Sequence, residues 1–226
     1  MRFRHTGGAG DIIHSLPFIR FMGGGEYAVG GLQGAKYDVF ASVERLLAAQ
    51  KYLTKIERFD AKVSADCDLD ALWRDPGNLL RSYALGYFDA FHVYEPQDWR
   101  SPWLTVPPRI PPSCETGFAV VNVTDRYRDL ELDWRFLMQK ARVRHEAVFF
   151  IGLESEHQQF KNEAGDIPFL PTKDFYEAAQ YICGAEALYS NQSACWTIAQ
   201  GLGKPFFLET RRPFAHKAVF NLPDEH

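Results

Sequence analysis

The sequence predicts an α/β protein with parallel sheets, and three observations support this fold class. Apolar runs that can form buried strands, as at 117–123 and 147–151, alternate with segments of helical periodicity. A glycine-rich turn follows the first strand candidate, at 1–5. The proline-rich segment 103–113 separates two halves that each show this alternation, so we expect domains at 1–108 and 109–226.

In the first half, we expect strands and helices in the order strand 1–5, helix 11–22, helix 37–53, strand 55–59 and helix 79–91, with glycines 23–25 ending the first helix. In the second half, we expect strands at 117–123, 147–151, 187–189 and 205–208. Helices are expected between them at 132–141, 154–163, 175–182 and 193–202. Thr172 or Asp174 caps the third of these helices, and Gly203 ends the last.

The composition is that of a globular protein in a reducing compartment. Its 226 residues are 46% hydrophobic and 15% aromatic, enough for a sizeable core. The net charge of −4 disfavours a dedicated nucleic-acid binder. The four cysteines form no C-x-x-C pair, which disfavours a zinc or redox motif. The sequence lacks an apolar run of 18 residues and a signal-peptide pattern, so we expect a cytoplasmic protein without a membrane span.

The glycine-rich turn places a carboxylate at a helix start. Gly7, Gly8 and Gly10 precede Asp11, but no third spaced glycine or Gly-Lys-Ser/Thr follows, so neither the dinucleotide nor the phosphate-loop motif is present. Asp11 is either a helix N-cap at a tight connection or a functional carboxylate at the carboxyl end of a strand. His14, three residues later, either packs in the core or orients a ligand beside Asp11.

Polar and charged residues also follow three successive strand candidates of the second half. Such positions share one edge of a parallel sheet, where ligands bind. Arg126 and Arg128 can meet an anion, and the helix start near Ser193 can hold a phosphate. Glu154 or Glu156 can hold ribose hydroxyls. The alternatives are a solvated loop, a plain helix cap and an acidic first helical turn.

Two segments resemble the family of ADP-heptose–lipopolysaccharide heptosyltransferases. Residues 7–17, with the glycine turn, Asp11, an apolar stretch and Pro17, resemble its N-terminal signature. Residues 189–205 resemble its late motif, which ends in Leu-Gly-x-Pro. Gln192, Ala194 and Thr197 stand where the family has Asp, Gly and His.

The resemblance implies a glycosyltransferase of the GT-B type, in which two Rossmann-like domains face each other across a cleft. Such enzymes invert the anomeric centre without a metal, and their only small-molecule requirement is the nucleotide-diphosphate sugar that serves as substrate. Asp11 would be the general base, with Gly8, Gly10 and His14 on the acceptor side. The donor-side residues would be Arg126, Arg128, Glu154, Glu156, Asn191, Gln192, Ser193 and Ala194.

The sequence does not identify the molecule that carries the acceptor hydroxyl. It can be a glycan, a lipid, a protein or a modified base. Two alternatives to the metal-independent inverting transferase also stay open. One is a non-catalytic module that binds a nucleotide or sugar on the same fold. The other is a glycosyltransferase that acts on modified bases in DNA, which the acidic balance disfavours.

Overall fold

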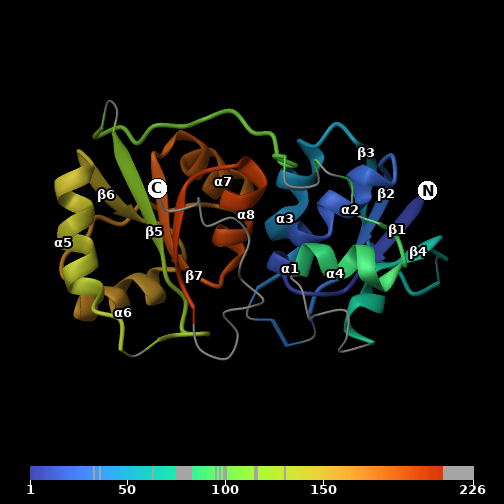
Figure 1. Ribbon diagram of the computed structural model, residues 1–226, viewed down its shortest axis with the longest axis horizontal. Coiled ribbons are helices and arrows are strands. Elements are labelled where there is room, and N and C mark those ends of the chain that lie inside the picture. Colours follow the sequence, from blue (N-terminus) through green and yellow to red (C-terminus); the bar gives the residue numbers. More distant parts are fainter. Residues whose placement is uncertain are drawn as a thin grey trace. The chain divides into compact units, whose positions relative to one another are not determined.

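The computed structural model describes residues 1–32, 34–35, 37–62, 64–74, 83–94, 96, 98, 101–114, 117–129 and 131–210. The chain divides into two compact units (Figure 1). The first contains Met1–Thr105 and the second begins at Val106. Residues 79–82 of one expected helix and 211–226 of the expected second domain lie outside the described residues.

The first unit holds a parallel sheet in the order β3-β2-β1-β4. Its strands are β1 (Arg2–His5), β2 (Gly25–Val29), β3 (Leu53–Arg58) and β4 (Cys67–Asp68). Its helices are α1 (Ala9–His14), α2 (Leu16–Phe21), α3 (Val39–Ala48), the 3-10 helix η1 (Leu69–Trp73) and α4 (Tyr83–Ala90). Helix α1 packs against α2, α3 and α4, so the four α-helices share one face of the sheet.

The opposite face of this first sheet is charged. Along β1 the side chains alternate, because Phe3 and His5 are fully buried while Arg2 and Arg4 are partly exposed. Arg4 pairs with Asp68 of β4 at 2.7 Å, and Arg2 pairs with Glu57 of β3. Among the described residues, ion pairs rather than helices therefore line this face.

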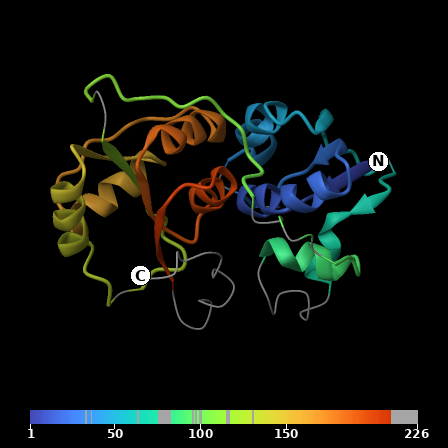
Figure 2. The ribbon, with the colours of Figure 1, turned by 45° about the horizontal axis from the view of Figure 1, so that its top comes forward.

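The second unit holds a parallel sheet in the order β6-β5-β7-β8. Its strands are β5 (Phe118–Asn122), β6 (Ala147–Phe150), β7 (Ala187–Asn191) and β8 (Phe206–Glu209). Its helices are α5 (Trp134–Arg144), α6 (Glu154–Ala164), α7 (Phe175–Gly184) and α8 (Ala194–Leu202). Helices α5 and α6 cover one face and α7 and α8 the other, so every residue of β5 is buried (Figures 1 and 2).

The fold class is confirmed, and the expected elements of the second half all form with shifted ends. Asp174, rather than Thr172, caps α7, since its carboxylate accepts from the Glu177 N–H at 2.9 Å. The single helix expected at 11–22 is wrong. It divides at Ser15, because Pro17 has no N–H to continue the ladder and the Ser15 hydroxyl bonds to the Ile12 carbonyl instead.

Two further expectations of the first half are corrected. The helix expected at 37–53 ends at Ala48, and Leu53 already begins β3. Strand β2 was not predicted, because the glycines at 23–25 indicated only a helix break.

Candidate functional site

Each sheet has a topological switch point, where the chain changes the direction in which it adds strands. In the first sheet this point lies between β1 and β4, and in the second between β5 and β7. Open α/β sheets bind ligands outside the carboxyl ends of the strands at such points. The two switch points are therefore the candidate sites, one in each unit.

Asp11 lies at the carboxyl edge of the first sheet, on the helix that follows β1. It is the third residue of α1, and Gly8 rather than Asp11 is the N-cap. The Asp11 carboxylate accepts a hydrogen bond from the Gly8 N–H at 3.0 Å. Asp11 is thus held beside the switch point and remains partly exposed.

The glycines of this turn serve close packing rather than an unusual backbone angle. None of Gly7, Gly8 and Gly10 has a positive φ. A Cβ on Gly7 would lie 2.5 Å from Cε1 of His5, which is far inside van der Waals contact. Gly8 and Gly10 are partly exposed beside Asp11. The turn therefore needs glycine at Gly7 because the His5 ring packs against it.

His14 belongs to the core of the first unit. It is 3% exposed, and its ring stacks on Tyr83 of α4 with centroids 5.5 Å apart. This environment favours the packing interpretation of His14 over a ligand-orienting one.

Two residues that the sequence did not single out, Asp70 and Tyr87, contact the same turn. Asp70 of η1 accepts from the Thr6 N–H at 2.9 Å and from the Thr6 hydroxyl at 2.7 Å. Burial alone would raise the pKa of Asp70, but hydrogen bonds from His5 and Thr6 outweigh it and hold that pKa well below its usual range. Tyr87 of α4 bonds to the His5 ring at 2.6 Å.

In the second unit, a buried polar network closes the start of α8 at the β5–β7 switch point. Ser193 is the N-cap of α8, and its hydroxyl donates to Oδ1 of Asn122 at 2.7 Å and lies 3.0 Å from the Ser190 hydroxyl. Asn122 in turn donates to the Ile151 carbonyl at 2.8 Å, which joins the ends of β5 and β6. Ser193 also accepts from the Trp196 N–H at 3.5 Å, so the network caps the first turn of α8.

Asn191 holds the loop that carries Arg126. Its amide nitrogen donates to the carbonyls of Thr124 and Arg126, each at 2.7 Å, and its amide oxygen accepts from the Thr124 N–H at 3.1 Å. Because both amide hydrogens are used, Asn191 supports the loop. Arg126 itself is exposed, with its guanidinium 5.8 Å from the centre of the Tyr127 ring.

Arg128 has a different environment from Arg126. Its guanidinium pairs with Glu209 of β8 at 3.2 Å and with Glu163 of α6 at 2.5 Å. Glu209 is fully buried at its side chain and also accepts from the Asp129 N–H and the Trp134 indole. Burial raises the pKa of Glu209, although these contacts oppose the shift. The charge of Arg128 is thus already compensated within the second unit.

The two glutamates of α6 differ in position. Glu154 is exposed, whereas Glu156 accepts from the Leu153 N–H at 3.2 Å. A Cβ on Gly152, which has φ of +137°, would lie 2.8 Å from Nδ2 of Asn122 and 3.2 Å from Oε2 of Glu156. Glu156 therefore lies close to the switch-point network.

The remaining expected donor-side residues lie at the same helix start. Gln192 is 9% exposed, and Ala194, the first residue of α8, is partly exposed. Burial, with a contribution from Glu156, raises the pKa of the neighbouring Cys195 thiol far above its usual range, so this cysteine is not an activated nucleophile.

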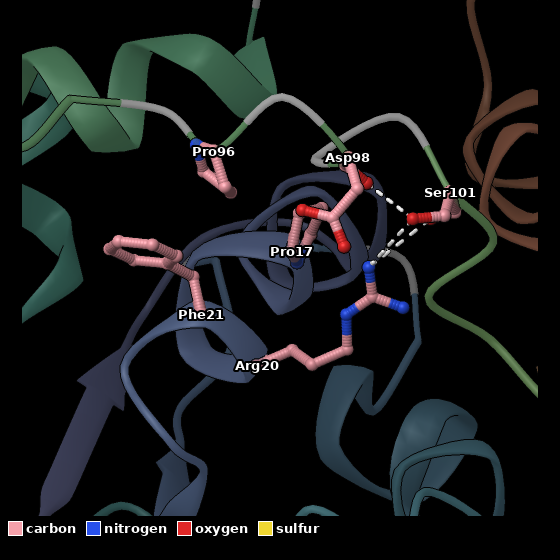
Figure 3. A pocket seen from close by; sticks show the side chains of 6 residues that line it. All are labelled: Pro17, Arg20, Phe21, Pro96, Asp98 and Ser101. Atoms are coloured by element: carbon pink, nitrogen blue, oxygen red, sulfur yellow. Dashed lines mark hydrogen bonds between the residues drawn. The ribbon is translucent and has the colours of Figure 1, made fainter.

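The first unit also has a pocket of about 440 Å³ on α2 (Figure 3). It is lined by Pro17, Arg20, Phe21, Pro96, Asp98 and Ser101. Arg20 donates to the main-chain oxygens of Pro102 at 2.6 Å and Ser101 at 3.4 Å. Arg20 thus holds the main chain at Ser101 and Pro102, shortly before the second unit begins.

No group of three His, Cys, Asp or Glu side chains among the described residues could hold a metal ion. None of the helices in this part of the chain is both long and apolar enough to cross a membrane.

No protein-family model matches the sequence, and no curated protein matches it. Solved structures do match. A family 9 glycosyl transferase from Veillonella parvula has a TM-score of 0.63 at 11% identity, over 92% of this chain and 79% of that one. The E. coli heptosyltransferase WaaC with ADP-2-deoxy-2-fluoro heptose has a TM-score of 0.53 at 12% identity, over 92% and 88%. E. coli ADP-heptose LPS heptosyltransferase II has a TM-score of 0.53 at 10% identity, over 92% and 83%.

The chain has a heptosyltransferase-like fold. The match covers nearly the whole chain with both sheets, so the GT-B fold class expected from the sequence is confirmed. At this level of identity, the likeness concerns the fold, and the roles of individual residues remain predictions.

Proposed function

We propose that this protein is a metal-independent, inverting glycosyltransferase that moves a sugar from a nucleotide-diphosphate donor to an acceptor hydroxyl. The observation that carries the proposal is the position of Asp11 at the switch point of the first sheet, in a chain with the heptosyltransferase-like fold. The solved relatives include a structure with ADP and one with a fluorinated ADP-heptose, which supports a sugar nucleotide as the donor class.

In the proposed reaction, Asp11 accepts the proton of the acceptor hydroxyl while the acceptor oxygen attacks the anomeric carbon. The bond to the nucleotide diphosphate breaks on the opposite face, so the configuration at that carbon inverts. A positioned base of this kind contributes about 10²- to 10⁴-fold to the rate. Asp11 suits this role because the Gly8 N–H fixes its carboxylate and leaves it partly exposed.

The departing diphosphate needs compensation of its negative charge, which we assign to the second unit. Helix α8 begins directly after β7 at the switch point, and the positive end of its dipole favours an anion. Arg126 is the better-placed cation, because its guanidinium is exposed and Arg128 already has two carboxylate partners. Glu156, close to the same network, is the better candidate of the two glutamates for the ribose hydroxyls.

A non-catalytic binding module is the second candidate, and Thr197 favours it. This residue stands where the heptosyltransferase late motif has His, and it is 1% exposed. Its hydroxyl bonds to the Ser193 carbonyl at 3.4 Å within α8. A hydroxyl that is buried and bonded within α8 offers no group to a donor.

The test is a screen of nucleotide-diphosphate sugars by thermal shift, followed by transfer and donor hydrolysis with the donors that bind. A specific donor at 100 times its Kd should raise the free energy of unfolding by about 2.7 kcal/mol. Transfer that continues in EDTA supports the metal-independent mechanism, and loss of transfer that a divalent ion restores contradicts it. Binding without transfer or hydrolysis would favour the module, and transfer only to modified DNA would identify the base-modifying alternative.

A further inference from the structure

His5 is at the centre of a buried network directly behind the glycine turn. Its side chain is fully buried at the end of β1. Nδ1 of the ring lies 2.8 Å from the Gly7 nitrogen and 3.1 Å from Oδ1 of Asp70. Nε2 lies 2.6 Å from the Tyr87 hydroxyl, which bonds to the main-chain oxygen of Asp11 at 3.0 Å. The network thus joins both ends of the turn to η1 and α4.

The contacts of Tyr87 determine which nitrogen of His5 carries a proton. Since the Tyr87 hydroxyl donates its hydrogen to the Asp11 carbonyl, its oxygen must accept from Nε2–H of His5. Burial raises the pKa of Tyr87 well above its ordinary value, so the phenol keeps this hydrogen throughout the accessible pH range. His5 therefore has Nε2 protonated in both of its charge states.

Nδ1 of His5 then has two partners that require opposite roles. The Gly7 N–H needs an acceptor, which Nδ1 provides when the imidazole is neutral. The Asp70 carboxylate needs a donor, which Nδ1 provides when the ring is an imidazolium. One atom cannot serve both at once, so the proton on Nδ1 decides whether the ring is bonded to the turn or to η1.

The titratable groups around the ring come from four elements. Asp70 of η1 and Tyr87 of α4 contact it directly. Asp11 of α1, Tyr27 of β2 and Tyr83 of α4 act on Tyr87 through space. Asp70 is the carboxylate in contact with His5, and it also holds Thr6, the residue between His5 and Gly7.

We propose that His5, Asp70 and Tyr87 are positioning residues for Asp11, and that His5 holds the glycine turn when neutral and releases Gly7 to bond with Asp70 when protonated. This inference rests on the proposed function only for its catalytic consequence. Transfer should fall when Nδ1 of His5 is protonated, because the turn that carries Asp11 loses one of its hydrogen bonds. The change of partner at Gly7 is expected whether or not the protein transfers a sugar.

The first test follows the Gly7 amide and the His5 ring by NMR as the pH is lowered. We expect the Gly7 N–H signal to titrate with the same midpoint as the His5 ring. Asp70→Asn should uncouple the two signals, because the carboxylate that accepts from the protonated Nδ1 is gone. If the Gly7 signal stays unchanged while the His5 ring signal changes, the exchange of partners at Nδ1 is overturned, even if the proposed function is correct.

The second test measures transfer by Tyr87→Phe, with Tyr27→Phe as the matched control. Tyr27 is an equally buried phenol of the same unit, but its hydroxyl bonds to Ser15 instead of the turn. We expect Tyr87→Phe to lower kcat tenfold or more with an unchanged KM for the donor, because misplacement of a reacting group by about 1 Å can cost 10²-fold. Tyr27→Phe should leave kcat within about twofold.

Equal effects of the two phenylalanine variants would overturn the positioning role of Tyr87. Asp70→Asn adds a readout that a merely structural role would not move, namely loss of the coupling between the Gly7 and His5 signals. A Gly7 amide that titrates with His5 in a protein without any transferase activity would instead separate the two claims. It would support the exchange at the turn and contradict the proposed function.

Discussion

The two sheets share a parallel design but differ in how many of their faces are buried. In the second unit, α5 and α6 cover one face and α7 and α8 the other, as is usual for parallel sheets. In the first unit, the described α-helices cover one face and ion pairs such as Arg4–Asp68 line the other. The difference shows that a parallel sheet can satisfy a polar face with charge pairs where helices are missing.

The connection between β3 and β4 accounts for part of this difference. In an open α/β sheet this crossover usually carries a helix on the second face. Here its described residues, 59–62 and 64–66, contain no helix. Phe59 instead lies under the guanidinium of Arg4, at 5.6 Å from the ring centre.

The largest expected effect tests whether chemistry belongs to the first unit and donor binding to the second. Asp11→Asn keeps an oxygen for the Gly8 N–H but removes the base, so transfer should fall by about 10²- to 10⁴-fold while donor affinity stays unchanged. Turnover and donor titration on the same preparation check this.

Asp133→Asn is the matched control for Asp11→Asn. Asp133 makes a similar bond at the start of α5, to the Phe136 N–H at 2.9 Å, on the opposite face of its sheet from α8. It should retain full turnover. Near-normal turnover in Asp11→Asn would instead favour the binding module.

The next effect tests the contrast between the two sheets. Phe150 of β6 is fully buried between its sheet and α6, so Phe150→Ala should lower the free energy of unfolding by about 3–5 kcal/mol. Lys55→Ala on the charged face of the first sheet should change it by less than about 1 kcal/mol, because the ion pair with Glu57 is solvated. Urea denaturation of both variants compares their losses of unfolding free energy. Comparable losses would contradict a solvated face on the first sheet.

A smaller effect separates the two arginines of the second unit. Arg126→Ala should weaken donor binding by roughly 1.5–3 kcal/mol with little change in stability, since a charged hydrogen bond to the diphosphate is lost. Arg128→Ala should mainly lower stability, because it leaves the buried Glu209 without its cation. Calorimetric titration and thermal unfolding distinguish these outcomes. Unchanged donor affinity in Arg126→Ala would remove this residue from the donor site.

The smallest effects concern the carboxylates of Asp70, which is partly exposed, and Glu209, which is buried, because their pKa values shift in opposite directions. The pKa of Asp70 is lowered, so its contribution to stability is present above its unfolded pKa of about 3.9 and is lost as the pH falls through the lower, folded pKa. The pKa of Glu209 is raised, so its contribution is present below about pH 4.3 and is lost as the pH rises through the higher, folded pKa.

Variants of Asp70 and Glu209 measure how the free energy of unfolding changes with pH, and the two changes should have opposite signs. The stability difference between wild type and Asp70→Asn should shrink on acidification below pH 4. The difference between wild type and Glu209→Gln should shift against wild type as the pH rises above about 4.3. Urea titrations at several pH values measure both stability differences. If the two differences changed with pH in the same direction, the environments described for Asp70 and Glu209 would be contradicted.

The same contrast explains which elements the sequence could predict. The second sheet is buried on both faces, so β5 and β6 are continuous apolar runs that pattern analysis detects directly. In the first unit, β1 alternates charge with apolar residues, and β2 follows three glycines that resemble only a break. Helix boundaries failed where one proline, Pro17, and one serine, Ser15, redistributed the backbone hydrogen bonds.

For the candidate site, the sequence could place residues at strand ends but could not find their partners. Asp11, Ser193 and Arg126 follow strands that periodicity identifies. Asp70 and Tyr87 meet the glycine turn only through long-range packing, and no local pattern marks them. The sequence also gave no sign that Arg128 is neutralised by Glu209, 81 residues away.

The contacts of Glu209 have a consequence for the order in which the molecule assembles. The loop after β5 is fixed by the last described strand, since Glu209 holds the Asp129 N–H and the Arg128 guanidinium. During synthesis this loop leaves the ribosome long before β8 does. Arg128 and the Asp129 N–H therefore cannot reach their final contacts until almost the whole second unit has been made, and a chain that stalls before β8 would contain every proposed donor-side residue but lack the carboxylate that pairs with Arg128.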